Sequence, residues 1–173
     1  MRLFHVSEQS DIRLFEPRIP TRSELAGGDG LVWAISETCL PNYLTPRDCP
    51  RVTFHVGRET TLEDCERFLS SPTCQHVVAI EAKWFPVMRD TTLYLYEFDP
   101  SDFRLQDAAA GYYVSRTWEK PLCVHRIDDL FDALFKRQVE LRVVDNLWPL
   151  NDMIRETTFD WSMCRMANAQ PPC

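Results

Sequence analysis

The chain has 173 residues, a formal net charge of −7 at pH 7, 45% hydrophobic residues and 26% charged residues. These values are typical of one globular domain, here residues 1–173, and the acidic balance excludes a broad nucleic-acid surface, which needs net basic patches. No apolar run reaches the roughly 18 residues that span a bilayer, so we expect no membrane segment and a cytoplasmic location.

The first half of the chain predicts three strands followed by a helix. Short apolar or alternating runs indicate strands over residues 3–7, 31–35 and 51–56, and the glycine-rich stretch 26–30 predicts a turn before the second strand. A helix is expected over residues 60–69. Thr60 and Glu63 have the spacing of a capping box, in which each side chain satisfies a backbone N–H of the first turn.

The second half predicts further strands and two helices. Strands are expected over residues 77–80, 92–98, 111–115, 122–124 and 140–144, and helices over residues 128–137 and 150–157. The strands outnumber the helices and do not alternate strictly with them. This order favours an α+β fold, with a largely antiparallel split sheet and a few peripheral helices, over a doubly wound parallel sheet.

The seven cysteines do not form a recognisable metal or disulfide pattern. Their number is odd, no CxxC pair occurs, and no Cys/His spacing matches a zinc site. We therefore expect reduced thiols, several of them buried, and no metal. Three of the four histidines, His55, His76 and His125, are each interpreted as structural.

His5 and Ser7 are the first candidate binding residues. They are two positions apart on the first predicted strand, so they share one face of the sheet. An imidazole beside a hydroxyl can hold a ribose or an amide. The alternative is a hydrogen-bonded, partly buried histidine of structural importance only.

Three arginines form a second candidate group, for anions. Arg47 and Arg51 lie near prolines that stiffen a turn, and Arg18 lies in an earlier proline-bounded loop. Guanidinium groups bind phosphate or carboxylate through paired N–H donors. The alternative is a surface arginine paired with Asp48.

Three short segments occur in the order found in ADP-ribosyltransferases, and the chain resembles that family. Leu-Phe-His-Val-Ser at 3–7 resembles the first motif strand, which carries a histidine followed by serine or threonine. Gly-Asp-Gly-Leu-Val-Trp-Ala at 28–34, followed by Asn-Tyr at 42–43, is similar to the second segment. Gly-Tyr-Tyr-Val-Ser at 111–115 is similar to the third. The chain is also similar to small uncharacterised bacterial proteins that consist of a domain of unknown function.

The resemblance implies NAD or an ADP-ribosyl group as the ligand. It assigns His5 and Ser7 to the ribose and amide on the nicotinamide side, Tyr43 to the stacking ring and Trp33 to the pocket wall. For both aromatic residues, ordinary core packing is the alternative.

Two departures from the family pattern make enzymatic activity uncertain. The tyrosine expected on the second strand aligns with Val32, and the catalytic glutamate aligns with Gly111. Loss of that carboxylate removes electrostatic stabilisation of the transition state. Glu119 and Glu97 are the candidate replacements, and we assign no catalytic residue. The expected function is therefore an NAD or ADP-ribosyl binding cleft. The alternative is a non-catalytic module that binds an anionic small molecule or a protein partner.

Overall fold

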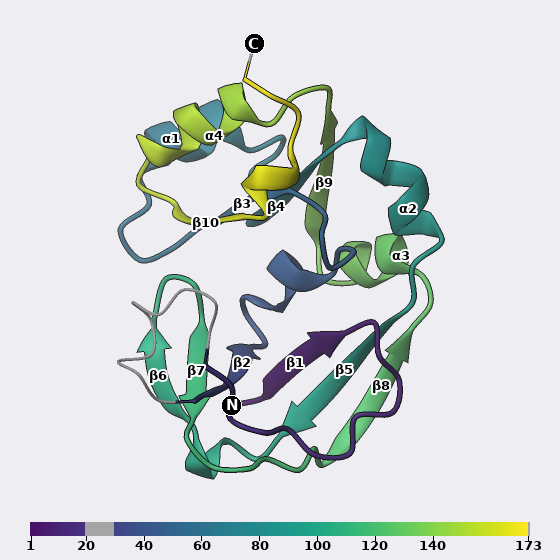
Figure 1. Cartoon of the computed structure of the whole chain (residues 1–173). Helices are drawn as coiled ribbons and strands as arrows, with labels where there is room; N and C mark the ends of the chain where they lie inside the picture. Colours follow the sequence, from purple (N-terminus) through teal and green to yellow (C-terminus); the bar gives the residue numbers. More distant parts are fainter. Residues whose placement is uncertain (20–29, 173) are drawn as a thin grey trace. The chain divides into compact units, whose positions relative to one another are not determined.

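The structure is a computed structural model, and it describes residues 1–19 and 30–172. Two sheets and four α-helices give it a mixed α+β secondary structure, which confirms the predicted fold class (Figure 1). The ADP-ribosyltransferase-like assignment stays a prediction. The chain divides into two compact units, the first made of residues 1–40 and 93–127 and the second of residues 41–92 and 128–173. Compact units need not fold independently, so the single domain expected from the sequence also stays a prediction.

The first unit is built on a six-stranded sheet. Its strands are β1 (Leu3–Ser7), β2 (Val32–Ser36), β5 (Leu93–Phe98), β6 (Arg104–Asp107), β7 (Tyr112–Ser115) and β8 (Cys123–Ile127). Their order across the sheet is β6-β7-β2-β1-β5-β8, and every neighbouring pair is antiparallel. A short 3-10 helix, Pro100–Asp102, connects β5 to β6. This order places β1 between β2 and β5 near the centre of the sheet.

Strand register gives the two sides of this sheet different residues. Residues directly opposite each other on paired strands point to the same side, and the side alternates along each strand. Leu3 faces Phe98 and Ser36 in the register, and a core cluster covers their side of the sheet. We call this side the Phe15 side. Its buried residues are Leu3, Phe15, Val32, Ala34, Tyr96, Phe98 and Phe103.

The second unit contains a four-stranded mixed sheet and the four α-helices. Its strands are β3 (Arg51–His55), β4 (His76–Glu81), β9 (Val139–Val144) and β10 (Asp160–Cys164), in the order β10-β3-β4-β9. Its helices are α1 (Leu62–Phe68), α2 (Phe85–Arg89), α3 (Leu130–Phe135) and α4 (Trp148–Arg155), with 3-10 turns at Ala82–Trp84 and Met166–Asn168; a further 3-10 turn, Leu40–Tyr43, spans the boundary between the units along the chain. Strands β4 and β9 are parallel, and the other two pairs are antiparallel. The core includes Val52, Phe54, Val77, Ala79, Leu147 and Ile154.

Helix α1 begins one residue later than the capping-box spacing indicates. Thr61 is the N-cap residue, and its hydroxyl accepts a hydrogen bond from the backbone N–H of Asp64. The Thr60 hydroxyl accepts a hydrogen bond from the N–H of Gly57 and donates one to the carbonyl of Thr158. Thr60 therefore ties two loops together, and the predicted cap position is wrong by one residue.

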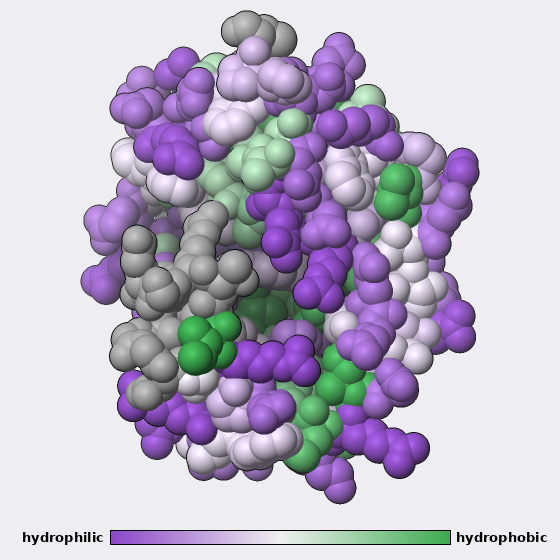
Figure 2. All heavy atoms as spheres, viewed as in Figure 1, coloured by the Kyte–Doolittle hydropathy of each residue, from purple (hydrophilic) through white to green (hydrophobic). Residues whose placement is uncertain are grey.

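The surface is largely polar. Polar residues cover most of the surface visible in Figure 2, and apolar residues form separate small patches there. Within the described residues, no helix combines the length and the apolar character needed to cross a bilayer. The glycine-rich turn predicted at 26–30 lies outside the described residues, except for Gly30.

Candidate functional site

His5 lies on β1 with its side chain on the Phe15 side of the first sheet. Its Nδ1 is 3.0 Å from the backbone carbonyl oxygen of Trp33, and its ring centroid is 4.8 Å from that of Phe15. A neutral imidazole donates to a carbonyl only through the nitrogen that carries the proton. The contact therefore favours the tautomer with its proton on Nδ1 and an acceptor at Nε2. The side chain is half-buried.

Ser7 and Tyr94 continue the same row of side chains. Ser7 is two residues beyond His5 on β1, and the register places Tyr94 of β5 directly opposite Ser7. Both residues are half-buried, and the Ser7 hydroxyl accepts a hydrogen bond from the backbone N–H of Gln9 at 3.1 Å. We call His5, Ser7, Tyr94 and the covering Phe15 the His5 strip. It combines an imidazole, a hydroxyl and two aromatic rings, as the sequence predicts for His5 and Ser7.

The side chains of the two other predicted cofactor residues do not belong to this row. Trp33 follows Val32 on β2, so its side chain is on the side of the sheet opposite His5, where its ring meets the edge of Tyr112 at 5.4 Å. Tyr43 belongs to the second unit. There the guanidinium carbon of Arg51 lies 5.0 Å from its ring centroid. The structure therefore groups His5 with Ser7, and the backbone carbonyl of Trp33 contacts His5.

Gly111 occupies the position where the family pattern expects the catalytic glutamate. It has a φ of +67° in the turn before β7. An added Cβ would lie 2.6 Å from both the sulfur of Cys39 and the hydroxyl oxygen of Ser36. Glycine is thus needed at position 111 for the turn, because the left-handed backbone and the lack of space for a Cβ both favour it.

Glu119, one candidate replacement, lies buried in the first unit with 7% exposure. Its Oε1 accepts hydrogen bonds from the hydroxyls of Ser115 at 2.5 Å and Thr117 at 2.9 Å. Its backbone pairs with that of Phe15, through N···O distances of 2.8 and 3.0 Å. The backbone of Glu119 therefore holds the Phe15 segment, which covers His5, while its carboxylate is held by two hydroxyls.

The three arginines predicted to bind anions are divided between the two units. Arg18 is an exposed residue of the first unit, and its backbone pairs with that of Leu31. Arg51 is 5% exposed, and its guanidinium donates to the backbone carbonyls of Asn42 and Cys49 at 2.5 and 3.0 Å. Arg47 is exposed, and its carbonyl accepts from Arg165. The contacts of Arg51 are thus those of a structural arginine that satisfies buried carbonyls.

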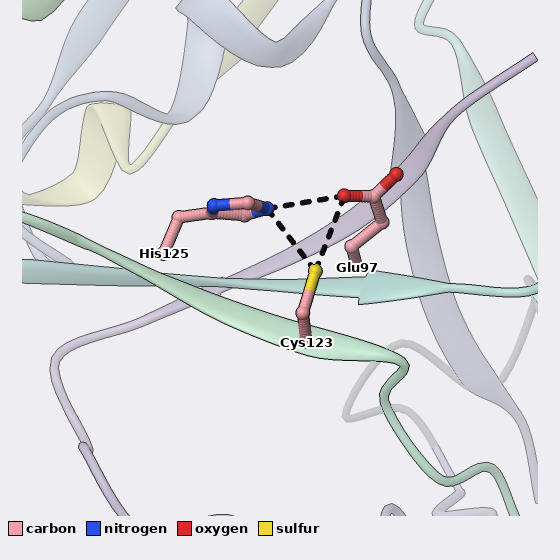
Figure 3. A group of neighbouring side chains, drawn as sticks. All are labelled: Glu97, Cys123 and His125. Atoms are coloured by element: carbon pink, nitrogen blue, oxygen red, sulfur yellow. Dashed lines mark hydrogen bonds and ion pairs between the residues drawn. The ribbon is translucent and has the colours of Figure 1, made fainter.

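A second group of polar side chains lies on the opposite side of the first sheet. Glu97 of β5 is directly across from Cys123 of β8, and His125 follows two residues later on the same side (Figure 3). The His125 Nε2 lies 3.1 Å from Glu97 Oε2 and 3.2 Å from Cys123 Sγ, and that sulfur lies 3.4 Å from the same Oε2. We call these three residues the Glu97 cluster. Three atoms that can ligate a metal converge there.

Arg2 anchors the carboxylate of this cluster. Its Nε and Nη2 each donate to Glu97, to Oε1 and Oε2 respectively, at 2.8 Å, and its Nη1 donates to Glu37 at 2.8 Å. The hydrogen bonds from Arg2 and then His125 lower the pKa of Glu97 to about 2. The pKa of the Cys123 thiol is raised, first by burial and then by the hydrogen bond to Glu97. Near neutral pH the cluster thus holds a carboxylate and a protonated thiol.

Local sequence patterns do not reveal the Glu97 cluster, because its members are distant along the chain. Only the Cys-Val-His segment at 123–125 was a local signal, since alternate residues of a strand share one face. The pairing of β5 with β8, which brings Glu97 to these two residues, is a long-range feature. A search for Cys/His spacings typical of zinc sites cannot detect it.

A buried pair of histidines marks the second unit. His55 and His76 stack with ring centroids 4.9 Å apart, and His76 Nε2 lies 2.7 Å from the side-chain oxygen of Asn42. Burial lowers the pKa of both imidazoles, that of His76 to about 3. Both rings are therefore neutral at neutral pH, which agrees with the structural interpretation of these two histidines.

Comparisons with known proteins give one match. No curated protein and no solved structure showed a significant match to the chain. Residues 4–169 match the model of a family described as a family of unknown function, DUF6886. This match agrees with the predicted similarity to uncharacterised proteins. It covers both units almost completely, so the chain belongs to the family of unknown function DUF6886.

Proposed function

We propose that the first unit binds the ADP-ribosyl part of NAD, or a related nucleotide, on the His5 strip. The observation that carries this is the row of His5, Ser7 and Tyr94, all half-buried on one side of the sheet, with the Phe15 ring packed on the imidazole. Pockets for small molecules combine aromatic walls with a few fixed polar groups. This row supplies both.

The chemistry of the row suits a ribose. With its Nδ1 proton directed at the Trp33 carbonyl, the His5 imidazole presents an acceptor at Nε2, and ribose hydroxyls are matching donors. The Ser7 hydroxyl can both donate and accept, so it suits an amide or a second hydroxyl. Each such hydrogen bond contributes about 0.5 to 1.5 kcal/mol, which corresponds to roughly 2-fold to 10-fold in affinity.

Tyr94 takes the role of the aromatic wall in this arrangement. It lies directly beside Ser7, on the same side of the sheet, whereas the side chain of Trp33 points to the opposite side. Stacking of a planar base on an aromatic ring contributes on the order of 1 to 3 kcal/mol. Trp33 then contributes its backbone carbonyl.

We propose binding without group transfer. Both candidate replacements for the missing glutamate have their carboxylates engaged, Glu119 by two hydroxyls and Glu97 by the guanidinium of Arg2. Stabilisation of an oxocarbenium-like centre needs a carboxylate directed at the reacting atom. Of the three arginines in the anion-binding alternative, Arg51 is unsuited to a ligand, because its guanidinium is buried against backbone carbonyls.

Calorimetric titration with NAD, ADP-ribose and ADP tests the proposed function. We expect ADP-ribose to bind the wild-type chain at one site, and His5→Ala and Ser7→Ala each to weaken binding by about 2-fold to 10-fold. His125→Ala is the matched control, because it removes an imidazole from the other side of the same sheet. Absence of binding by the folded wild-type chain contradicts the proposal, as does an equal loss of affinity in the His125→Ala control.

A further inference from the structure

The Glu97 cluster is independent of the nucleotide site, since it lies on the opposite side of the sheet from His5. Antiparallel pairing sets its geometry. Glu97 and Cys123 face each other across β5 and β8, and the two-residue period of β8 brings His125 to the same side. Figure 3 shows the three side chains pointing toward one another, with the carboxylate, thiol and imidazole tips in contact.

The spacing of the three atoms matches a tetrahedral metal site. Zinc bonds of about 2.0 to 2.3 Å at tetrahedral angles place the ligand atoms about 3.4 to 3.6 Å apart. The observed separations are 3.1 Å between N and O, 3.2 Å between S and N, and 3.4 Å between S and O. Shifts of a few tenths of an ångström in the side chains would therefore complete three ligand bonds, which rotation about side-chain bonds can supply.

The same contacts do not suit a nucleophilic triad. In such a triad the histidine uses one ring nitrogen for the nucleophile and the other for the carboxylate. Here both Cys123 Sγ and Glu97 Oε2 lie against the same nitrogen, Nε2 of His125. One nitrogen cannot relay a proton between two partners that it contacts simultaneously. The three atoms instead lie close enough together to act as ligands of one shared cation.

We propose that Glu97, Cys123 and His125 bind one zinc-class divalent cation through Oε2, Sγ and Nε2. A ligand set of one sulfur, one nitrogen and one oxygen selects zinc and its neighbours over magnesium and calcium, which prefer oxygen alone. Three protein ligands leave the fourth tetrahedral position to water or a substrate atom. The exposed side chain of His125 is consistent with an open position of this kind.

Binding requires one proton to leave the cluster. The cation replaces the proton of the Cys123 thiol, which goes to solvent, and the sulfur binds as thiolate. The carboxylate is already ionised. To bind the cation, Nε2 of His125 must be without the proton that it directs at Glu97, so the ring proton moves to Nδ1. Arg2 acts as a positioning residue, because its two hydrogen bonds fix the plane of the Glu97 carboxylate. The positive charge of Arg2 also repels the cation, so Arg2 fixes the carboxylate geometry but lowers the affinity for the cation.

Titration of the full chain with Co²⁺ under reducing conditions tests the site. Cobalt is a spectroscopic substitute for zinc, and a thiolate ligand produces a near-ultraviolet charge-transfer band. We expect one equivalent of Co²⁺, displaceable by Zn²⁺, with about one proton released per ion near neutral pH. Cys123→Ser is expected to abolish the band, and His125→Ala to weaken binding at least tenfold while keeping the thiolate.

Two matched variants keep the outcome decisive. Cys65→Ser removes a partly buried thiol of the second unit, and His5→Ala removes the histidine on the other side of the first sheet. Both are expected to bind Co²⁺ with unchanged affinity and an unchanged band. The proposed site is overturned if the band survives in Cys123→Ser, if it is lost in Cys65→Ser, or if the folded wild-type chain binds no Co²⁺ at up to millimolar concentration.

Discussion

Replacing Tyr96 by phenylalanine is expected to loosen the segment that covers the His5 strip. Tyr96 is fully buried on β5, and its hydroxyl donates to the carbonyl of Gln9 at 2.7 Å and accepts from the N–H of Ile12 at 3.1 Å. This one oxygen therefore fixes two backbone positions of the segment that leads to Phe15. Phenylalanine keeps the ring in the core and removes only these two hydrogen bonds.

The expected cost follows from the two lost bonds. A typical hydrogen bond contributes about 0.5 to 1.5 kcal/mol, and a buried group left without a partner costs about 1 to 3 kcal/mol. Gln9 is exposed, so water replaces the lost partner at its carbonyl, whereas Ile12 is only half exposed. We therefore expect a loss of about 1 to 2 kcal/mol, which corresponds to a 5-fold to 30-fold change in an opening equilibrium.

Hydrogen exchange of the Ile12 amide measures this directly. The amide is expected to exchange about 5-fold to 30-fold faster in Tyr96→Phe than in the wild type, while amides of the second-unit core keep their rates. Tyr94→Phe serves as a control, since it removes a hydroxyl from the same side of β5 without touching the Gln9 and Ile12 bonds. Unchanged protection of Ile12 in Tyr96→Phe would refute the inference that this hydroxyl fixes the segment.

Three further outcomes are expected. Gly111→Ala should lower the free energy of unfolding by about 1 to 2 kcal/mol, measured by urea denaturation, because the left-handed backbone disfavours a Cβ and the sulfur of Cys39 occupies its space. The free energy of unfolding should fall as the pH drops from about 6.5 towards 3, because His76 binds a proton in the unfolded chain over this range while burial lowers its pKa in the folded chain to about 3. An NMR titration in which the His76 ring of the folded protein titrates near pH 6.5 would contradict this. Arg2→Ala should raise the pKa of Glu97 from about 2 towards its ordinary value. The wild type loses the stability contributed by the ionised Glu97 as the pH falls from about 4.5 to 2, and the variant should lack most of this pH-dependent loss. An unchanged titration of the Glu97 carboxyl in Arg2→Ala would contradict this prediction.

Local patterns in the sequence predict most of the strands. The alternation and apolar runs at 3–7, 51–56 and 92–98 correspond closely to β1, β3 and β5, because burial on one or both faces leaves a period that can be read locally. Strands β6 and β10 were missed. Every residue of β6 is exposed, and those of β10 are all half-buried, so neither presents a clear alternation.

Pairing between strands is what the sequence does not reveal. The shared face of His5 and Ser7 follows from the period of one strand, and the register agrees with it. Which side Trp33 occupies depends on the register between β1 and β2, which a single strand cannot specify. The contact between Glu97 and Cys123 likewise depends on the pairing of β5 with β8. Candidate residues within one strand are therefore predictable, and constellations across strands are not.

Binding of the nucleotide on the His5 strip can be followed by recording the NMR signals of all four imidazole rings while ADP-ribose is added. His5, His55, His76 and His125 are the only histidines in the chain, so the rings report on three places: the His5 strip, the Glu97 cluster and the stacked pair of His55 and His76. Binding on the His5 strip predicts saturable shifts of the His5 ring, with the rings of His55, His76 and His125 unchanged. Binding that shifts other rings and leaves His5 unchanged, or a titration that shifts no ring, would contradict the assignment of the nucleotide to this strip.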